Sequence, residues 1–372
     1  MISRECWAVA AACFVGLAGS GAGAGVEVTL RAQPDFQKGI VSGLEVRDGQ
    51  LVLYRIEDTF KTDSRQQYKI RGSISDGVDE FGITNSVTDA AMATIQTRPD
   101  NCLLVETHDN DAITIARDVA PTTKGVLSMD IWPLRFWPTS GRLNVDLIES
   151  GERSISFALA ASDYKNPTTK TYDGATLSSP GGKPYFTSTV NSDIYQPSYP
   201  VPKSEQRWWP VRLLFRPAYV AGSLDGSVCR EIKDPARKPI MVRRIEFGIG
   251  QLETYIRALR FKSLLGEAVS SPLPRTGSKW VEVKWDGATP DKTRIGVQIR
   301  TADTEGDLSQ AAWSGPTADK PYFTEPGAIA AAVAVRKWMQ VRILLKAEQD
   351  APFEVTPALR TVTVVQQQGD AP

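Results

Sequence analysis

The side chains that catalyse most hydrolytic reactions are scarce in this sequence of 372 residues. It contains a single histidine, His108, so any Ser-His-Asp or Cys-His arrangement must use that residue. No Gly-x-Ser-x-Gly motif occurs, and neither Cys102 nor Cys229 lies in a recognisable nucleophile motif. The two cysteines and His108 also lack the spacing of zinc ligands. The sequence therefore argues against a serine, cysteine or zinc hydrolase.

The polar turn His108-Asp109-Asn110-Asp111 lies between two predicted strands. Hard oxygen ligands suit calcium, so Asp109 and Asp111 are candidate metal ligands. The Asp-x-Asp-x-Asp-Gly pattern of a calcium loop is absent, and a hairpin turn with local side-chain bonds to the backbone explains the same residues. Calcium is thus the one cofactor the sequence offers, with an ordinary turn as the alternative.

Alternating strands supply a different kind of candidate site. In residues 126–134, Leu127, Met129 and Ile131 are predicted to point inward. The same period of two recurs in residues 143–147, 154–162, 208–216 and 244–249, as an antiparallel sheet with one wetted side requires. The outward residues on these strands are Asp130, Trp132, Asn144, Asp146, Trp208, Arg212, Arg244 and Glu246.

If these outward side chains share one concave face, they form a binding surface suited to carbohydrate. Trp132 and Trp208 would stack on the apolar faces of sugar rings. The carboxylates would bond to hydroxyl groups, and the guanidinium groups would bind sugar carboxylates. The alternative is a solvated sheet face of mixed charge.

The same residues offer two enzymatic alternatives. Asp130 together with Asp146 or Glu246 would suit the carboxylate pair of a glycosidase. A lyase needs a proton-abstracting tyrosine beside a charge-neutralising arginine, and Tyr195 or Tyr199 near Arg212 would supply them. No strand carries a closely spaced acidic cluster, so the sequence favours binding without chemistry.

The charge balance narrows the class of partner. Lysine and arginine together number 43, as do aspartate and glutamate, and the formal net charge is +0. No long run of like charge occurs, so the chain as a whole has no attraction for nucleic acid or acidic lipid. Beyond the N-terminal segment, no stretch is apolar enough to cross a bilayer.

Residues 1–24 have the pattern of a secretory signal, with a basic residue at Arg4, an apolar region at 7–17 and the small residues Ala22-Gly23-Ala24. A membrane anchor and lipidation at Cys13 are the alternatives. We expect a secreted protein, periplasmic or extracellular, whose mature chain begins at Gly25. In that compartment Cys102 and Cys229 are candidates for a disulfide, with two unpaired buried cysteines as the alternative.

The mature chain is predicted to be all-β, with one or two helical turns at residues 89–95. Residues 163–207 are rich in proline and tyrosine, which indicates an ordered excursion over a sheet. A proline-containing linker at 268–278 would separate a large domain, residues 25–267, from a small β-sandwich, residues 279–366.

Four elements follow one another in an order that resembles the laminin-G-like, concanavalin-like jelly-roll superfamily. They are the strand led by Trp209, the Leu224-Asp225-Gly226 hairpin, the Ile245-Glu246-Phe247-Gly248 strand and the closing strand at 255–261. The resemblance covers residues 25–266 but is specific only for 208–261. The resemblance implies an antiparallel jelly-roll sandwich. The superfamily includes glycan-binding modules, adhesion modules, glycoside hydrolases and polysaccharide lyases. Arg257 stands where that family often has an acidic residue, so no role is carried over to it. The C-terminal part is similar to fibronectin-like or discoidin-like sandwiches.

From these observations we expect a secreted, two-domain, non-catalytic protein that binds an extracellular polysaccharide or cell-surface component. The alternatives are a polysaccharide lyase or glycoside hydrolase that uses the same face, and a structural or adhesive surface protein.

Overall fold

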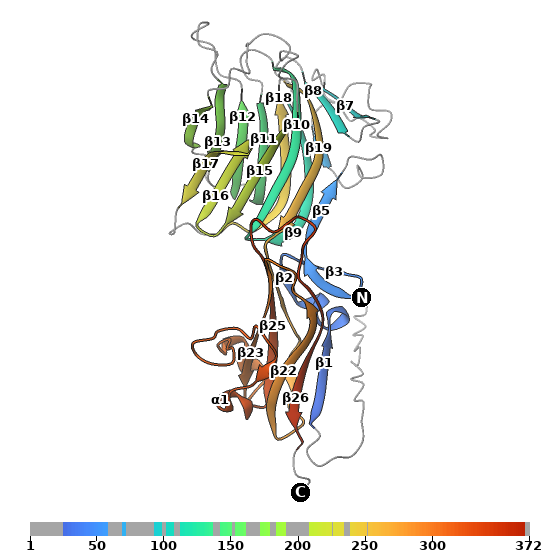
Figure 1. Cartoon of the computed structure of the whole chain (residues 1–372), viewed down its shortest axis with the longest axis vertical. Helices are drawn as coiled ribbons and strands as arrows, with labels where there is room; N and C mark the ends of the chain where they lie inside the picture. The colour runs from blue at the N-terminus through green and yellow to red at the C-terminus, as the bar shows by residue number, and fades with distance from the viewer. Residues whose placement is uncertain are drawn as a thin grey trace, which may run out of the picture.

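The structure, a computed structural model, describes residues 25–58, 69–71, 93–98, 102–107, 112–136, 142–150, 153–160, 172–178, 184–190, 208–224, 226–233, 239–250 and 252–368. The chain forms two all-β domains stacked along the long axis of the molecule, an upper and a lower one (Figure 1). Both are built from antiparallel sheets.

The upper domain is a sandwich of two sheets, which overlap in the view of Figure 1. Sheet I has the strand order β17 (Ser227–Lys233), β16 (Tyr219–Leu224), β15 (Trp209–Arg216), β10 (Gly125–Phe136), β19 (Leu252–Ser263), β8 (Cys102–Thr107) and β7 (Ala93–Arg98), and β5 (Arg55–Asp58) also pairs with β19. Sheet II has the order β14 (Pro184–Val190), β13 (Tyr172–Ser178), β12 (Arg153–Ala160), β11 (Arg142–Ser150), β18 (Val242–Gly250), β9 (Ala112–Thr122) and β6 (Lys69–Arg71).

The predicted alternation of inward and outward residues is confirmed. Leu127 and Leu213 from sheet I are buried in one core with Val145, Phe157 and Phe247 from sheet II. This core fills the space between the two sheets, so the even-numbered neighbours on these strands point away from it on both sides. The predicted hairpin at 224–226 is also confirmed, since Leu224 pairs with Ser227 and Gly226 has a φ of 78°.

The lower domain contains two further sheets. Sheet III has the order β24 (Gly327–Ala328), β22 (Lys279–Ala288), β26 (Ala358–Gln367), β4 (Gln50–Leu53) and β3 (Leu44–Arg47), and β1 (Val26–Arg31) also pairs with β26. Sheet IV has the order β2 (Ile40–Ser42), β20 (Leu265–Val269), β25 (Trp338–Ala347) and β21 (Leu273–Pro274), with β23 (Thr293–Ala302) on the other edge of β25. Short helical turns lie at Ala32–Phe36, Gln37–Gly39, Gly306–Gln310 and α1 (Ala331–Ala334).

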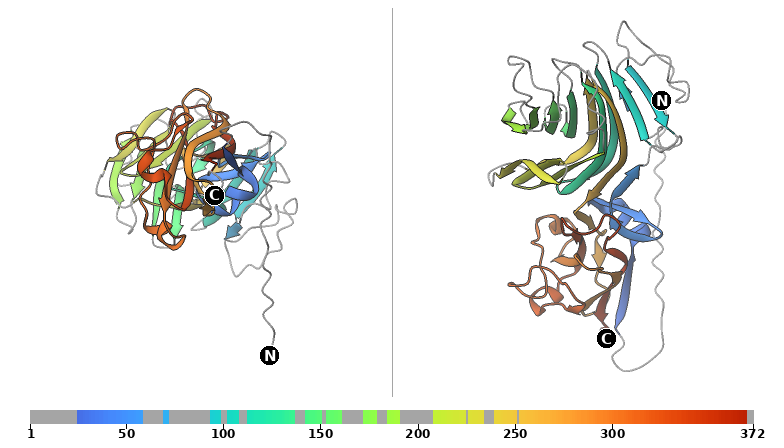
Figure 2. Two further views of the ribbon diagram at one scale, coloured as in Figure 1. Left: turned by 90° about the horizontal axis from the view of Figure 1, so that it is seen from below. Right: turned by 45° about the horizontal axis from the view of Figure 1, so that its top comes forward.

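The predicted domain boundaries are wrong, because both ends of the chain build the lower domain. Strand β1 runs antiparallel to β26, with Val26 opposite Gln366, and Figure 2 shows β1 in blue beside the lower domain. Phe36 and Leu51 are buried in the lower core with Trp280. The domain predicted at 25–267 therefore loses its first four strands. The predicted linker 268–278 contains β21 and the end of β20, which both pair with β25.

Two other structural predictions need correction. The excursion at 163–207 contains strands β13 and β14, which extend sheet II at one edge. The helical turn predicted at 89–95 overlaps strand β7, which pairs with β8 and begins at Ala93. In both cases strand pairing with a neighbour determines the local structure, and local sequence preference does not report it.

The predicted disulfide is also wrong for this fold. Cys102 lies on β8 and Cys229 on β17, and four strands of sheet I separate them. At about 4.8 Å per strand, their backbones are roughly 24 Å apart. A disulfide requires Cα atoms less than about 7 Å apart.

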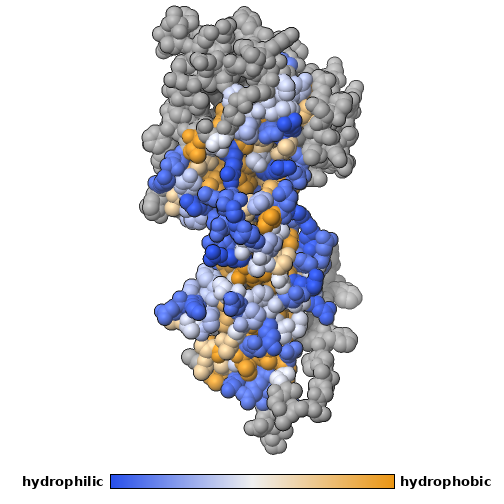
Figure 3. All heavy atoms as spheres, viewed as in Figure 1, coloured by the Kyte–Doolittle hydropathy of each residue, from blue (hydrophilic) through white to orange (hydrophobic). Residues whose placement is uncertain are grey.

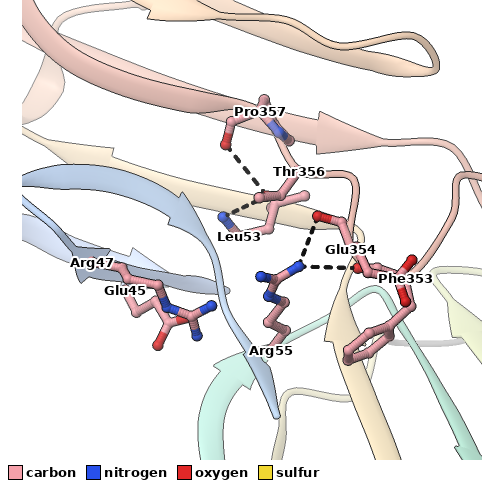
Figure 4. A network of polar contacts seen from close by, with 8 residues as sticks. All are labelled: Glu45, Arg47, Leu53, Arg55, Phe353, Glu354, Thr356 and Pro357. Carbon is pink, nitrogen blue, oxygen red and sulfur yellow. Dashed lines mark hydrogen bonds and ion pairs between the residues drawn. The ribbon is translucent and has the colours of Figure 1, made fainter. Parts of the chain in front are cut away.

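The segment between β25 and β26 of the lower domain contacts the upper domain and forms the joint between them (Figure 4). Arg55 Nη1 donates a hydrogen bond to the carbonyl oxygen of Glu354 at 2.7 Å, and its guanidinium carbon lies 5.9 Å from the centre of the Phe353 ring. The Arg260 guanidinium lies 5.6 Å from the same ring. Leu53 N donates to Thr356 Oγ1 at 3.2 Å. The surface over this joint is mostly hydrophilic in the view of Figure 3.

Candidate functional site

The structure divides the predicted site residues between two surfaces. Asp130, Trp132, Trp208 and Arg212 belong to or adjoin sheet I, whereas Asn144, Asp146, Arg244 and Glu246 belong to sheet II. Because the core lies between the sheets, these two groups point in opposite directions. The prediction of one shared concave face is therefore wrong. It failed because the period of two shows which side of a strand is wet, but not which sheet the strand joins.

The group on sheet I forms an aromatic cluster of Trp132, Trp208 and Tyr255. The rings of Trp132 and Trp208 are perpendicular with centroids 5.4 Å apart, and Tyr255 lies 6.5 Å from Trp208. The guanidinium carbon of Arg257 lies 3.9 Å from the centre of the Trp208 ring, and Arg257 Nε is 3.2 Å from Asp130 Oδ2. Trp208 is therefore already stacked by a cation of the same chain, which leaves less of its ring for a ligand.

Arg257 reaches this cluster through an irregularity that the sequence did not reveal. Ala258 has a φ of 51°, in the left-handed region, and the register between β10 and β19 shifts between Ser128 and Asp130. This β-bulge places both Arg257 and Arg260 outside the core, while Ile256 and Leu259 are buried.

Arg212 has a different role from the predicted one. Its Nη2 donates a hydrogen bond to the carbonyl oxygen of Gln349, at 2.6 Å, in the segment that joins the domains. Its guanidinium group therefore contributes to the joint.

The group on sheet II forms a polar strip of Asn144, Asp146, Arg244, Glu246 and Gly248. Asp146 on β11 and Glu246 on β18 lie directly opposite each other in the antiparallel register. Arg244 Nε is 2.8 Å from Glu246 Oε1, and both side chains are partly exposed. Asn144 is opposite Gly248, and among the described residues a Cβ atom on that glycine would meet only atoms of Asn144, at 3.5 and 3.6 Å. The strip thus combines carboxylate, amide and guanidinium groups with a glycine, which has no side chain of its own.

The neighbouring strand β9 adds small side chains beside the strip. Thr114 lies opposite Gly248 and Ala116 opposite Glu246. A glycine within a strand often marks a place where a ligand approaches the backbone closely. The sequence showed Gly248 on the outward side of its strand, but it did not show that Thr114 and Asn144 flank it.

Four predicted residues lie outside the described part of the chain: Asp109, Asp111, Tyr195 and Tyr199. Among the residues that are described, no three His, Cys, Asp or Glu side chains gather as metal ligands. Since the predicted calcium turn is not among them, calcium stays a prediction. Across the same described ranges, no helix has the length and apolar character needed to span a membrane.

No protein-family model matches the sequence, and no curated protein is significantly similar to it. Several solved structures are distantly similar in fold. A galectin-like protein of unknown function from Bacillus subtilis is 12% identical with a TM-score of 0.37, and covers 57% of this chain and 96% of its own. The CBM2 module of the evolved Dit protein of Lactobacillus casei BL23 phage J-1 is 11% identical with a TM-score of 0.39, and covers 57% and 95%. Lectin I-B4 from Griffonia simplicifolia is 11% identical with a TM-score of 0.34, and covers 56% and 98%. These likenesses are too distant to assign a ligand or an activity to this chain.

Proposed function

We propose that the upper domain binds a carbohydrate on the polar strip of sheet II. The observation that carries the proposal is the pairing of Asp146 with Glu246 across β11 and β18, next to Gly248, where a Cβ atom would fit in ordinary contact with Asn144. Sugar hydroxyl groups both donate and accept hydrogen bonds, so a carboxylate pair with an adjacent amide and guanidinium offers complementary partners. The missing side chain at Gly248 allows a sugar ring to come close to the strand.

Filling the space above Gly248 tests this proposal without changing any charge. Gly248→Val places methyl groups over the strip, and valine suits a strand, so we expect the domain to fold and to lose binding. The measurement is retention of the full chain on a panel of neutral and uronate-containing polysaccharides. Gly296→Val is the matched control, because a Cβ at Gly296 also meets only one side chain, Tyr322, at 3.5 Å or more. Equal retention of Gly248→Val and wild type would count against this face.

A glycoside hydrolase is the second candidate, and the same carboxylate pair favours it. Directly opposed residues on antiparallel strands have Cβ atoms about 5 Å apart. Retaining glycosidases hold their two carboxyl groups about 5–5.5 Å apart, a separation that the flexible side chains of an aspartate and a glutamate at this Cβ spacing can reach. If the protein cleaves its ligand, new reducing ends will appear on incubation, and Glu246→Gln will abolish them. If it only binds, no reducing ends will form with wild type.

A lyase has less support, because Arg212 is engaged at the joint and both candidate tyrosines lie outside the described residues.

The other alternative is an adhesive protein that recognises a protein partner. Deglycosylating the partner distinguishes it from a carbohydrate-binding protein, because protein recognition should survive that treatment.

We also propose that the protein is exported, on the strength of the signal pattern at residues 1–24. Mass spectrometry of the mature protein should then find Gly25 at its N-terminus. We further propose that the upper domain is laminin-G-like or concanavalin-like and that the lower domain is fibronectin-like or discoidin-like. The strand order at 208–261 supports the first of them.

A further inference from the structure

The outer face of sheet IV, in the lower domain, gathers positive charge. Strand β23 presents Arg294 and Arg300 on this face, and the paired strand β25 presents Arg342 and Lys346. Two more cations, from the upper domain, lie at the end of the face that meets the joint. We call this set the basic strip: Lys124, Arg216, Arg294, Arg300, Arg342 and Lys346.

Like charges in this strip lie close together. Arg294 is directly opposite Lys346 in the register of β23 and β25, and both side chains are exposed. Like charges in that position destabilise a sheet. At the joint, burial lowers the pKa of Lys124, and the positive charges of Lys346 and Arg216 lower it further, while the negative charge of Glu348 raises it. The fold therefore holds these cations near one another at a cost.

The carboxylates paired with this strip do not balance it. Glu267 Oε2 is 2.7 Å from Arg342 Nη2, and Glu348 Oε1 is 3.9 Å from Arg294 Nη2. Arg300 donates to neutral acceptors, the Gln340 Oε1 at 2.6 Å and the Ser309 carbonyl oxygen at 3.3 Å. Among the described residues, the cations of the strip thus outnumber the carboxylates that contact them.

Trp313 lies against the guanidinium groups of Arg300 and Arg342. The guanidinium carbons of Arg300 and Arg342 are 4.5 and 5.6 Å from the centre of its ring. This contact orients both groups and keeps them partly out of water, where their attraction for an anion is stronger.

We propose that the basic strip is a second binding site, for a polysaccharide that carries carboxylate or sulfate groups. An extended polyanion lying along β25 would meet the cations in succession and would relieve the repulsion between Arg294 and Lys346. Guanidinium groups bind carboxylates and sulfates through paired hydrogen bonds. The chain as a whole has a formal net charge of +0, so such binding depends on this local arrangement. Because Trp313 already stacks with arginine, its ring is a poor platform for the bases of a single-stranded nucleic acid.

The test removes two exposed charges from the strip of the full-length protein. The strip variant carries both Arg294→Gln and Lys346→Gln. The control variant carries both Lys284→Gln and Arg360→Gln, which change the net charge by the same amount on sheet III of the same domain. Affinities for polygalacturonate, dextran sulfate, neutral dextran and single-stranded DNA are measured at low and physiological ionic strength. Thermal unfolding checks that each variant is folded.

We expect wild type to bind one or both acidic polysaccharides and to lose affinity as salt rises. Polygalacturonate and dextran sulfate distinguish carboxylate from sulfate as the group recognised. The strip variant should bind about tenfold more weakly, and the control variant should bind like wild type. An equal loss in the control, binding to neutral dextran as tight as to the acidic polymers, or tighter binding to DNA than to either acidic polymer would each overturn the proposal. Gly248→Val leaves this strip intact, so the two proposed sites can fail independently.

Discussion

Lys262 is a buried cation at the joint between the domains, with 1% of its surface exposed. Its Nζ donates hydrogen bonds to the carbonyl oxygens of Pro352, at 2.8 Å, and of Val355. Burial, and to a smaller degree the charge of Arg55, lowers the pKa of Lys262 to about 8 from 10.5, while Glu354 raises it. At neutral pH the folded protein therefore carries a charge that it holds less favourably than the unfolded chain does.

This pKa predicts how stability changes with pH. Between about pH 8 and 10.5 the unfolded chain keeps a proton that the folded chain has released, so the free energy of unfolding rises with pH in this window. The total gain from this group is at most roughly 3 kcal/mol. Denaturant unfolding at several pH values measures it, with Lys262→Met as the reference. The raised pKa values of Tyr54 and Tyr219 lower the free energy of unfolding above about pH 10 in both proteins. The difference in free energy of unfolding between the two proteins therefore isolates the contribution of Lys262. A difference that does not change with pH would contradict the assignment.

At the scale of the elements, the two sheets of the upper domain approach closely where Gly222 of β16 meets Phe157 of β12. A Cβ atom on Gly222 would lie 2.3 Å from the Phe157 ring, which is buried in the core. We expect Gly222→Ala to lower the free energy of unfolding by about 2 kcal/mol through overpacking. Gly306→Ala is the control, since nothing lies within 4 Å of a Cβ there. Denaturant unfolding that ranks the two variants equally would refute this contact.

The strands themselves were largely predictable, because each buries one side. The alternation at Leu127, Val145 and Leu213 gave the correct inward residues. The partners of each strand were not predictable. Asp130 and Asp146 occupy equivalent outward positions in the sequence pattern, yet they lie on different sheets. The bulge at Ala258 also left no signal, since alanine has no preference for a positive φ.

At the scale of the whole molecule, the lower domain is closed by strands from both ends of the chain. Residues 264–367 alone lack strands β1 to β4 and the turn at Ala32–Phe36. They therefore lack Phe36, Leu51 and Leu53 of the core. We expect this fragment to be unfolded. Because Val26 is opposite Gln366, a turn of about four residues can join the end of β26 to the start of β1. A permuted chain of 264–367 followed by 25–53 should therefore fold, as circular dichroism and thermal unfolding would show. A folded 264–367 fragment, or an unfolded permuted chain, would contradict this arrangement.

The joint between the domains bears on function because it determines which faces of the upper domain stay accessible. Sheet I is contacted by the lower domain through Arg212, and Leu214 of sheet I is part of the lower core. The lower core contains no described residue of sheet II. The lower domain therefore covers part of sheet I and also meets sheet II at the end of β9, where Gly43 N donates to the carbonyl oxygen of Pro121. The polar strip lies on the neighbouring strands β11 and β18.

The most direct test of carbohydrate binding on sheet II is one substitution made on each side of the sandwich. Asp146→Asn and Asp130→Asn change the same chemical group at equivalent outward positions, and calorimetry measures the affinity of each for the polysaccharide that retains wild type best. We predict that Asp146→Asn weakens binding about tenfold or more, because a hydrogen bond to a charged group is lost, and that Asp130→Asn binds like wild type. Weaker binding by Asp130→Asn alone, or no change in either variant, would contradict the proposed site.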